Sequence, residues 1–317
     1  MAKVRAGVVG VGHLGYHHAR IYAESSEADL VGVVDMDSGR RAKASSDFQT
    51  QGFDSIAELL KAGVDAVSIV VPTRAHASAA CQALEAGVDV LVEKPIATTL
   101  EEARAIVGTA ARCGRLVQVG HIERFNGAVM RLFEAVKKPR FIECHRLSPY
   151  PNRGDDVSVV LDLMIHDLEI VRALAGAAIT RVDASGVSVF SHYEDIANAR
   201  LRFASGCVAN ITSSRISMER MRKIRIFSED AYVSTDYSAQ EITVYRKKPG
   251  AIPPGSNPME WIEIDVLPVE REEPLKLELH SFLASVLDRK RPLVSGDDAL
   301  EALELADQVM RAIKETT

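Results

Sequence analysis

The chain has 317 residues, enough for two domains of about 150 residues each, and 47% of them are hydrophobic while 26% are charged. This composition disfavours disorder, no run approaches the roughly 18 apolar residues of a membrane span, and the net charge of -6 argues against a nucleic-acid binder. The N-terminus lacks the cleavage site of a signal peptide, so we expect a cytoplasmic protein. The four cysteines are widely spaced with no C-x-x-C pair, which predicts reduced thiols and no metal site.

The N-terminal part of the chain alternates short apolar runs with longer helical patterns. The runs are rich in Val, Ile and Leu with little polar alternation, which is typical of parallel strands buried on both faces. We predict strands at residues 4–9, 30–34, 66–71, 88–92 and 116–119, and helices at residues 14–23, 56–62, 75–86 and 100–113. This alternation predicts an α/β domain with a doubly wound parallel sheet of the Rossmann type.

After residue 124 the chain changes to β-like runs in which polar and apolar residues alternate, as in an antiparallel sheet with one covered face. We predict strands at residues 141–147, 181–190, 197–203, 208–213, 223–227, 231–235, 242–245 and 261–266, and helices at residues 158–175, 275–287 and 299–313. Residues 247–258 are rich in Pro and Gly and predict a loop. We therefore expect a dinucleotide-binding domain over residues 1–123, followed by an α+β domain for substrate binding and oligomerisation over residues 124–317.

A G-x-G-x-x-G motif follows the first predicted strand and opens a helix. In such a loop Gly10 permits the tight turn, Gly12 lets a pyrophosphate approach the backbone, and Gly15 lets helix and strand pack closely. The helix N-terminus offers free N–H groups to phosphate, and His13 lies in the same loop. Asp35 ends the next strand twenty residues after Gly15, where a carboxylate can accept hydrogen bonds from both ribose hydroxyls. These residues predict a dinucleotide cofactor.

The acidic residue also bears on which dinucleotide binds. A carboxylate at Asp35 repels the 2′-phosphate of NADP, and Asp37 adds a second negative charge. Arg40 and Arg41 are near enough in sequence to compensate. We therefore expect NAD to be preferred, with NADP as the less favoured alternative.

Two further motifs place ionisable residues in positions that suit a functional site. Glu93-Lys94-Pro95 lies at the end of a predicted strand, where ligand crevices open in parallel sheets. Asp162 and His166 lie four residues apart on a predicted helix, so they share one side of it, and Glu169 continues that side. With this spacing, Asp162 is placed to orient the imidazole of His166 or to stabilise its charge.

Taken in order, these motifs resemble the Gfo/Idh/MocA oxidoreductases over essentially the whole chain. The resemblance is carried by G-x-G-x-x-G, Asp35, Val71-Pro72-Thr73 with His76, Glu93-Lys94-Pro95 and Asp162-x-x-x-His166. It implies a C-terminal domain with a large, open, mostly antiparallel sheet, a cis peptide bond before Pro95, and NAD(P)-dependent chemistry on a sugar or cyclitol hydroxyl. It places the catalytic residues at Lys94, Asp162 and His166. For oxidation of such a hydroxyl, His166 is our candidate base and Lys94 would stabilise the alkoxide; the alternative, in which Lys94 with a lowered pKa is the base, stays open.

The expected binding residues follow from the same motifs. For the cofactor they are Gly10, Gly12, His13, Leu14, Gly15, Asp35, Pro72, Thr73, His76, Glu93 and Lys94. For the substrate they are Glu123, Arg124, Asn126, Arg153 and Glu169. Arg153 is our best candidate for holding a diphosphate, because a guanidinium fork suits phosphate oxygens; Arg215, Arg220 and Arg222 form a second group of candidates or a solvated turn.

A narrower resemblance is to the family branch that oxidises C3 of UDP-N-acetylglucosamine, carried by residues 119–126, 148–153 and 159–167. One departure is Gly127, where that branch has Pro. The branch makes a 3-keto sugar that a partner aminotransferase converts to a 3-amino sugar for lipid A. The alternatives are a dehydrogenase of a free sugar or cyclitol, such as inositol, and a non-catalytic regulator that senses NAD. We further expect a homodimer or homotetramer formed through the C-terminal sheet, whose uncovered face would be semi-apolar.

Overall fold

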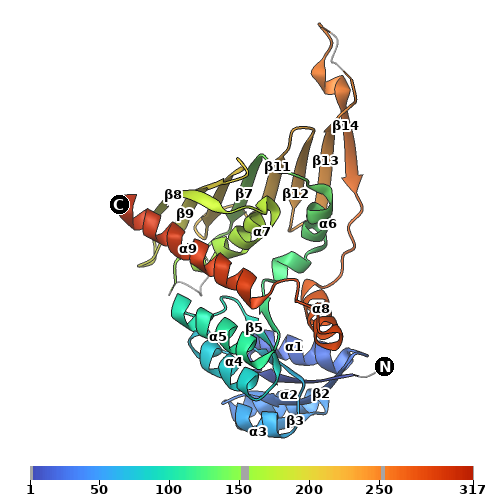
Figure 1. Ribbon diagram of the computed structural model, residues 1–317, viewed down its shortest axis with the longest axis vertical. Helices are drawn as coiled ribbons and strands as arrows, with labels where there is room; N and C mark the ends of the chain where they lie inside the picture. Colours follow the sequence, from blue (N-terminus) through green and yellow to red (C-terminus); the bar gives the residue numbers. More distant parts are fainter. Residues whose placement is uncertain (1–2, 151–156, 251–253, 317) are drawn as a thin grey trace. The chain divides into compact units, whose positions relative to one another are not determined.

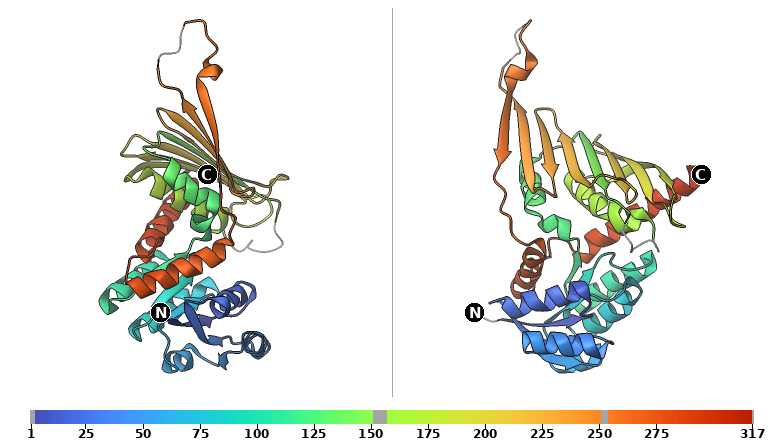
Figure 2. Two further views of the ribbon diagram at one scale, coloured as in Figure 1. Left: turned by 90° about the vertical axis from the view of Figure 1, so that its right-hand side faces the viewer. Right: turned by 180° about the vertical axis from the view of Figure 1, so that it is seen from behind.

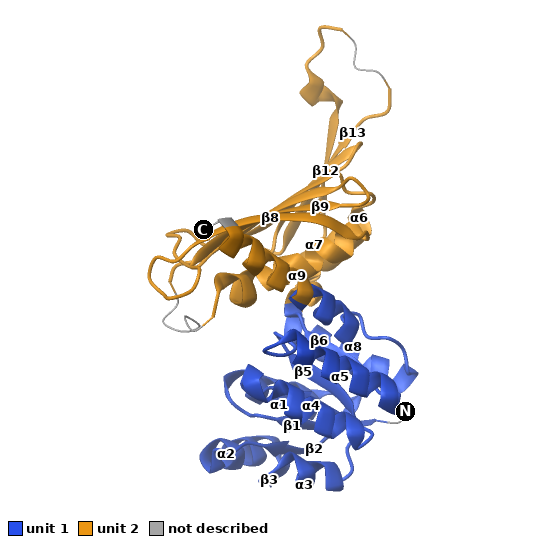
Figure 3. Cartoon of the chain, turned by 60° about the vertical axis from the view of Figure 1, so that its left-hand side comes forward, with its two compact units in different colours: residues 1–122, 273–303 blue, residues 123–272, 304–317 orange. Residues whose placement is uncertain are grey.

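The computed structural model describes residues 3–150, 157–250 and 254–316, and the chain divides into two compact units (Figure 3). Unit 1 comprises residues 1–122 and 273–303, and unit 2 comprises residues 123–272 and 304–317. None of the described helices is both long enough and apolar enough to cross a membrane.

Unit 1 contains a six-stranded sheet in which every pair of neighbouring strands is parallel (Figure 1). The strand order, β3-β2-β1-β4-β5-β6, is that of the Rossmann fold, so the predicted fold class is confirmed. The strands are β1 (Val4–Val9), β2 (Ala28–Val34), β3 (Gln51–Phe53), β4 (Ala66–Ile69), β5 (Asp89–Glu93) and β6 (Val117–Gly120). The helices are α1 (His13–Glu24), α2 (Ser38–Phe48), α3 (Ile56–Lys61), α4 (His76–Glu85), α5 (Leu100–Cys113) and α8 (Pro274–Asp288).

The core of unit 1 explains why a helix from the far end of the sequence belongs to it. The apolar side of α8, including Leu279 and Phe282, packs with β1 and with Ala19 and Tyr22 of α1. Residues 273–303 therefore group with unit 1, which corrects the predicted boundary that assigned them to the second domain. The first boundary, at residue 123, differs from the observed one by a single residue.

Unit 2 is built on an eight-stranded sheet of order β14-β13-β12-β11-β7-β10-β9-β8. All neighbouring strands are antiparallel except β10 and β7, so the expected mostly antiparallel sheet is confirmed. The strands are β7 (Phe141–Leu147), β8 (Ile179–Val187), β9 (Ile196–Phe203), β10 (Val208–Ser214), β11 (Met221–Phe227), β12 (Ala231–Asp236), β13 (Glu241–Lys247) and β14 (Ile262–Leu267). The helices are α6 (Gly127–Ala135), α7 (Ile165–Ala175) and, from residue 304 on, α9 (Gly296–Thr316).

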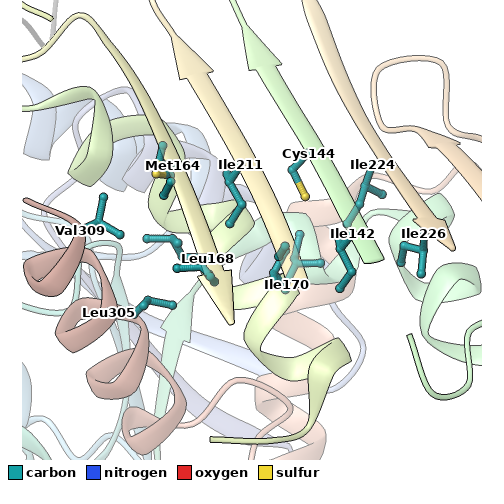
Figure 4. Close-up of a cluster of buried hydrophobic side chains, with 14 of the residues drawn as sticks. Ile142, Cys144, Met164, Leu168, Ile170, Ile211, Ile224, Ile226, Leu305 and Val309 are labelled. Atoms are coloured by element: carbon teal, nitrogen blue, oxygen red, sulfur yellow. The ribbon is translucent and has the colours of Figure 1, made fainter. Parts of the chain in front are cut away.

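These helices lie on one face of the sheet (Figure 2). Leu168 of α7 and Leu305 and Val309 of α9 point toward inward-facing residues such as Cys144 and Ile211, and together they form the core of unit 2 (Figure 4). In the part of the chain that the structure describes, no helix covers the opposite face. That open face was expected from the alternation of polar and apolar residues along the strands.

Three elements were not predicted. α2 buries only Ala44, so it has no apolar stripe, and β3 is three residues long. α6 begins directly after Asn126, whose side chain caps the helix by accepting a hydrogen bond from the N–H of Ala128.

One predicted strand is shorter than expected. The predicted strand 181–190 ends at Val187, because Asp195 accepts the N–H groups of residues 189–191 and so holds them out of the sheet.

Candidate functional site

The glycine loop of unit 1 joins β1 to α1, and at two of its three glycines the packing excludes a side chain. Gly10 has φ 91°, and a Cβ built on it would lie 2.4 Å from the carbonyl oxygen of Val70. A Cβ on Gly15 would lie only 1.8 Å from the carbonyl oxygen of Gly10. Both glycines are therefore required by close backbone packing, as the motif predicts.

Gly12 has the opposite surroundings. A Cβ there would have a single neighbour within 4 Å, the Nη1 atom of Arg40 at 3.5 Å. Gly12 is also the N-cap of α1, no side chain caps that helix, and the next two residues, His13 and Leu14, are exposed. An uncapped helix N-terminus with open space at a glycine suits a pyrophosphate. This end of α1 therefore fits a dinucleotide.

Asp35, at the end of β2, is hydrogen-bonded to this loop. Its Oδ2 accepts a hydrogen bond from the N–H of Val11 at 2.9 Å, and its Oδ1 accepts one from the N–H of Asp37 at 2.8 Å. Arg41 donates to the carbonyl oxygen of Asp35, and Arg40 lies 3.4 Å from the carboxylate of Asp37. Both arginines that could compensate a 2′-phosphate thus have partners already.

His76 joins two turns at the same edge of the sheet. Its Nδ1 lies 2.9 Å from the carbonyl oxygen of Pro95, and its Nε2 lies 2.9 Å from that of Val71. The peptide bond between Lys94 and Pro95 is cis, which confirms the expectation drawn from the family. Because both ring nitrogens are held by the backbone and the side chain is buried, His76 positions the turn that begins with Pro72-Thr73. The predicted direct contact between His76 and the cofactor stays a prediction.

Lys94 follows the last residue of β5, Glu93, and is half-buried. Since carboxyl ends of parallel strands meet at one edge, Lys94 shares that edge with the glycine loop after β1 and with Asp35 after β2. The residues predicted to bind the cofactor at the ends of β1, β2 and β5 thus lie at one edge of this sheet, and their binding of a cofactor stays a prediction.

In unit 2, Asp162 lies in a π-helical turn, Val160–Met164, that leads directly into α7. The N–H of Ile165 donates to the carbonyl oxygen of Val160, five residues back. The sequence predicted one regular helix here, and the wider turn is a feature that often occurs at functional sites. Because the hydrogen bond of this turn spans five residues, Asp162 and His166, which are four residues apart, lie on the same side of the helical segment. Asp162 is half-buried and His166 is buried.

The start of this helical segment is anchored by Arg215. Its Nη1 donates to the carbonyl oxygen of Val157 at 2.8 Å, and its Nε donates to Asp195 at 2.8 Å. Although burial opposes it, the backbone N–H donors and Arg215 hold the pKa of Asp195 well below its usual range. Arg215 is fully buried, so it is not open to a diphosphate, which corrects our inclusion of it among the candidates.

A buried ion-pair network lies beside His166. Arg146 donates two hydrogen bonds to Asp167, of 2.8 and 3.0 Å, and one of 2.8 Å to Glu123. Arg222 also reaches Glu123, at 3.4 Å. Burial alone would lower the pKa of Arg146, but Asp167 and Glu123 raise it well above its usual value. Glu123 was predicted to bind substrate, and the structure commits its carboxylate to this network.

Three further predicted substrate residues have partners within unit 2. Arg124 pairs with Glu169 at 2.5 Å and stacks over the ring of Phe133. Asn126 caps α6 and donates to the carbonyl oxygen of Tyr237 at 3.1 Å. These contacts stabilise the fold, and substrate binding by Glu123, Arg124, Asn126 and Glu169 stays a prediction; Arg153 lies outside the described residues.

Sequence reasoning missed Arg146, although a signal was available. On β7 the inward-facing residues are Ile142, Cys144 and Arg146, so alternation alone places a guanidinium on the apolar face of the sheet. A charge at such a position needs a buried partner. Among the described residues, no three His, Cys, Asp or Glu side chains form a cluster that could hold a metal ion.

Both halves of the chain match models of one protein family. Residues 4–121 match the oxidoreductase family with an NAD-binding Rossmann fold, and residues 133–234 match the GFO/IDH/MocA C-terminal domain. Together the two matches cover most of the chain. They agree with the fold of each unit and with the order of the motifs.

Two curated relatives are similar to the chain over nearly its full length. UDP-N-acetylglucosamine 3-dehydrogenase from Acidithiobacillus ferrooxidans is 36% identical, covering 99% of this chain and 98% of the relative. The NAD-dependent scyllo-inositol 2-dehydrogenase from Bacillus subtilis is 30% identical, covering 96% and 92%. A solved structure of the Acidithiobacillus enzyme matches with a TM-score of 0.91 at 35% identity and covers 99% of both chains.

Substituting Gly15 tests the glycine loop. We expect Gly15→Ala to weaken NAD binding at least tenfold and to destabilise the protein by about 1–3 kcal/mol, because its Cβ would overlap the carbonyl oxygen of Gly10. Calorimetry of NAD binding and urea unfolding measure the two effects. In the control, Gly108→Ala inside α5, the new Cβ would meet only Arg112 at 3.9 Å, so we expect unchanged binding. Unchanged NAD affinity in Gly15→Ala would contradict the assignment of this loop.

Proposed function

The chain belongs to the Gfo/Idh/MocA oxidoreductase family, and from that premise we propose that it is an NAD-dependent dehydrogenase that oxidises the C3 hydroxyl of UDP-N-acetylglucosamine to the 3-keto sugar. The observation that carries the substrate is the full-length similarity to a UDP-N-acetylglucosamine 3-dehydrogenase. A 3-keto nucleotide-sugar is a substrate for transamination. The proposal therefore includes a partner aminotransferase and a 3-amino sugar of the lipid A type as the destination.

The reaction removes a hydride and a proton from a secondary alcohol. Bound NAD supplies the hydride acceptor, and Gly10, Gly12, Gly15 and Asp35 would hold it. In the proposal, a ring nitrogen of His166 takes the hydroxyl proton, and Asp162 orients the imidazole or binds a neighbouring substrate hydroxyl.

Lys94 completes this mechanism from unit 1. Its Nζ donates a hydrogen bond to the substrate oxygen and stabilises the negative charge that develops there. The exchange of roles, with Lys94 as the base, is the alternative. Either mechanism requires Lys94 to meet Asp162 and His166 around one hydroxyl group, and this meeting of residues from the two units is part of the proposal.

The second candidate function is oxidation of a free cyclitol, favoured by the similarity to scyllo-inositol 2-dehydrogenase. A substrate panel read by NADH absorbance separates the two, with an amine present to trap the ketone. We expect kcat/KM for UDP-N-acetylglucosamine to exceed that for UDP-glucose, inositol and free glucose at least tenfold. A higher kcat/KM for inositol would transfer the assignment to the cyclitol. Absence of turnover with NAD binding intact would favour a cofactor-sensing regulator.

Single substitutions test the proposed catalytic residues. We expect His166→Ala and Lys94→Ala each to lower kcat by roughly 10²–10⁴, because each removes proton transfer or charge stabilisation from the transition state. NAD affinity measured by calorimetry should survive His166→Ala. Matched controls are His280→Ala on α8 and the exposed Lys61→Ala, which should retain normal kcat. Near-normal turnover by both His166→Ala and Lys94→Ala would refute the mechanism.

Asp35 tests the cofactor preference. We expect the unmodified protein to bind NAD more tightly than NADP, and Asp35→Asn to narrow that gap by about tenfold, since it removes repulsion of the 2′-phosphate while keeping one acceptor oxygen. The comparison variant is Asp37→Ser, which removes the second negative charge and keeps an oxygen at the N-cap of α2, so it should narrow the gap less than Asp35→Asn does. Calorimetry with both cofactors reads the ratio. Tighter NADP binding by the unmodified protein would contradict the prediction.

The open face of the sheet in unit 2 supports the proposed homodimer or homotetramer. Phe227, Tyr232 and Tyr245 stack across β11, β12 and β13 with ring centroids 4.7 and 5.0 Å apart, and Ile264 on β14 continues the row. Ile264 is 60% exposed, and Met259 lines a hollow of about 490 Å³ beside the row. An apolar row of this kind suits the same row on a second copy related by a twofold axis.

The assembly prediction is tested at the edge of that row. We expect the protein to be at least dimeric by light scattering at micromolar concentration, and Ile264→Asp to shift the mass toward the monomer because it places a charge in the contact. Ile264 is exposed, so circular dichroism should be unchanged. Glu263→Gln, which alternation places on the other face of β14, is the control and should leave the mass unaltered. A monomeric mass for the unmodified protein would overturn the prediction.

A further inference from the structure

Glu278 is a carboxyl group with 0% exposure, placed on the side of α8 that packs into the core of unit 1. Its neighbours along the same helix side, Leu275, Leu279 and Phe282, are apolar core residues. Burying an ionised carboxylate in such surroundings is costly unless a cation or several donors compensate it. The proposed mechanism does not use Glu278, so its presence here needs another explanation.

The polar groups around Glu278 offer it no compensating charge. Gln118 on β6 donates its Nε2 to the backbone carbonyl oxygen of Glu278 at 3.0 Å, and Tyr22 on α1 is paired with Ser68 on β4 at 2.8 Å. Within residues 3–150, 157–250 and 254–316, no group donates a hydrogen bond to either carboxyl oxygen of Glu278, and Gln118 Oε1 also lacks a donor there. The interior thus holds a surplus of acceptors.

A second carboxyl group, that of Glu93, packs over β6, the strand whose Gln118 contacts Glu278. Its Oε1 lies 3.2 Å from Nε2 of His18, and its Oε2 accepts the backbone N–H of Lys94 at 3.3 Å. It packs so closely over Gly120 that a Cβ there would lie 2.7 Å from Oε2. Glu93 is therefore wedged between α1, β6 and the turn that presents Lys94.

The titratable groups that act on Glu278 are Glu93 from β5 and Tyr22 from α1, with His18 beyond Glu93. Burial raises the pKa of Glu278 well above its usual value, and the charge of Glu93 raises it further. Two carboxyl groups whose charges interact in a poorly solvated site are more stable when one of them keeps its proton. The surplus of acceptors and the charge of Glu93 thus point to the same protonation state.

We propose that Glu278 is a neutral carboxylic acid whose O–H group donates to the carboxylate of Glu93, and that it is a positioning residue for the Glu93-Lys94 turn. A proton on Glu278 supplies the donor that this set of acceptors lacks, and the ionised Glu93 is the strongest acceptor among them. Glu93 held in this way fixes the backbone N–H of Lys94. Through Glu93, Glu278 then helps to position Lys94 at the edge of the sheet where the cofactor is proposed to bind. Only this last step rests on the proposed function.

The protonation state has a signature in stability. Above about pH 4.5 an unfolded chain releases the proton of Glu278, while the folded chain keeps it, so folding becomes less favourable as the pH rises toward the raised pKa of the folded state. Glu278→Gln removes this loss. We expect the unfolding equilibrium constant of the unmodified protein, relative to that of Glu278→Gln, to rise by about tenfold per pH unit between pH 5 and 7.

Infrared difference spectroscopy and urea unfolding test the proton directly, without substrate. The unmodified protein should show the carbonyl band of a protonated carboxyl group at pH 7, and Glu278→Gln should lose it. Asp288→Asn, at the exposed end of α8, is the matched control and should keep it. If Glu278→Gln and the unmodified protein had the same carboxyl band, Glu278 would be ionised and the proposal would be overturned. The same follows if the difference in unfolding free energy between the two proteins did not change with pH.

The positioning role is read from NAD binding by calorimetry, which is independent of which sugar is oxidised. We expect Glu278→Leu, which keeps the volume but has no donor, to weaken NAD binding by about tenfold, while Glu278→Gln, whose amide can donate to Glu93, stays within about twofold of the unmodified protein. Equal NAD affinity in both variants would refute the positioning role. If Glu278→Leu weakened NAD binding as expected but UDP-N-acetylglucosamine was not the preferred substrate, only the proposed substrate would be refuted.

Discussion

The guanidinium of Arg146 is the charge on which the candidate chemistry of unit 2 depends. It is buried between Asp167, the neighbour of His166, and Glu123, at the point where unit 2 begins. Removing one partner of such a group is costly, about 3–5 kcal/mol, because the remaining charges stay buried without compensation. The bidentate contact also fixes direction, since a planar fork meets a carboxylate in few orientations. The start of α7 is thus fixed by a single side chain from β7.

The same helical segment is held at its other end by Arg215, which reaches Val157 and Asp195. Between these two anchors lies the π-helical turn that contains Asp162. A turn with irregular hydrogen bonding would be free to relax to a regular helix if its ends could move. Two buried arginines, one on each side of the segment, remove that freedom and keep Asp162 and His166 on one side of the helix.

The sequence predicted unit 1 better than unit 2 because the motifs of unit 1 depend on close backbone packing. Gly15 and Asp35 make their contacts within one strand–helix–strand segment, and Gly10 packs against the carbonyl oxygen of Val70 just after β4, so a short motif contains most of the argument. In unit 2, the partners of Arg146 and Arg215 lie about 20 residues or more away in sequence, and no local pattern joins them. The strands were predictable from alternation, while α2 was missed because it buries only Ala44. The apolar side of α8 does not say which of two sheets it covers, and only the packing with β1 decides that.

The two units bury charge in opposite ways, and each way suits its task. Unit 2 matches the buried guanidinium groups of Arg146 and Arg124 with carboxylates, so each buried charge has a partner and the start of α7 is held in place. Unit 1 places Glu278 against Glu93 with no cation at Glu278 among the described residues, so the low-energy state is the one that carries a proton. A paired ion is a rigid anchor, whereas the proton proposed on Glu278 limits the negative charge beside Lys94 to that of Glu93. In the proposed mechanism Lys94 binds a developing alkoxide, and a nearby negative charge that is held in place and limited to one suits that task.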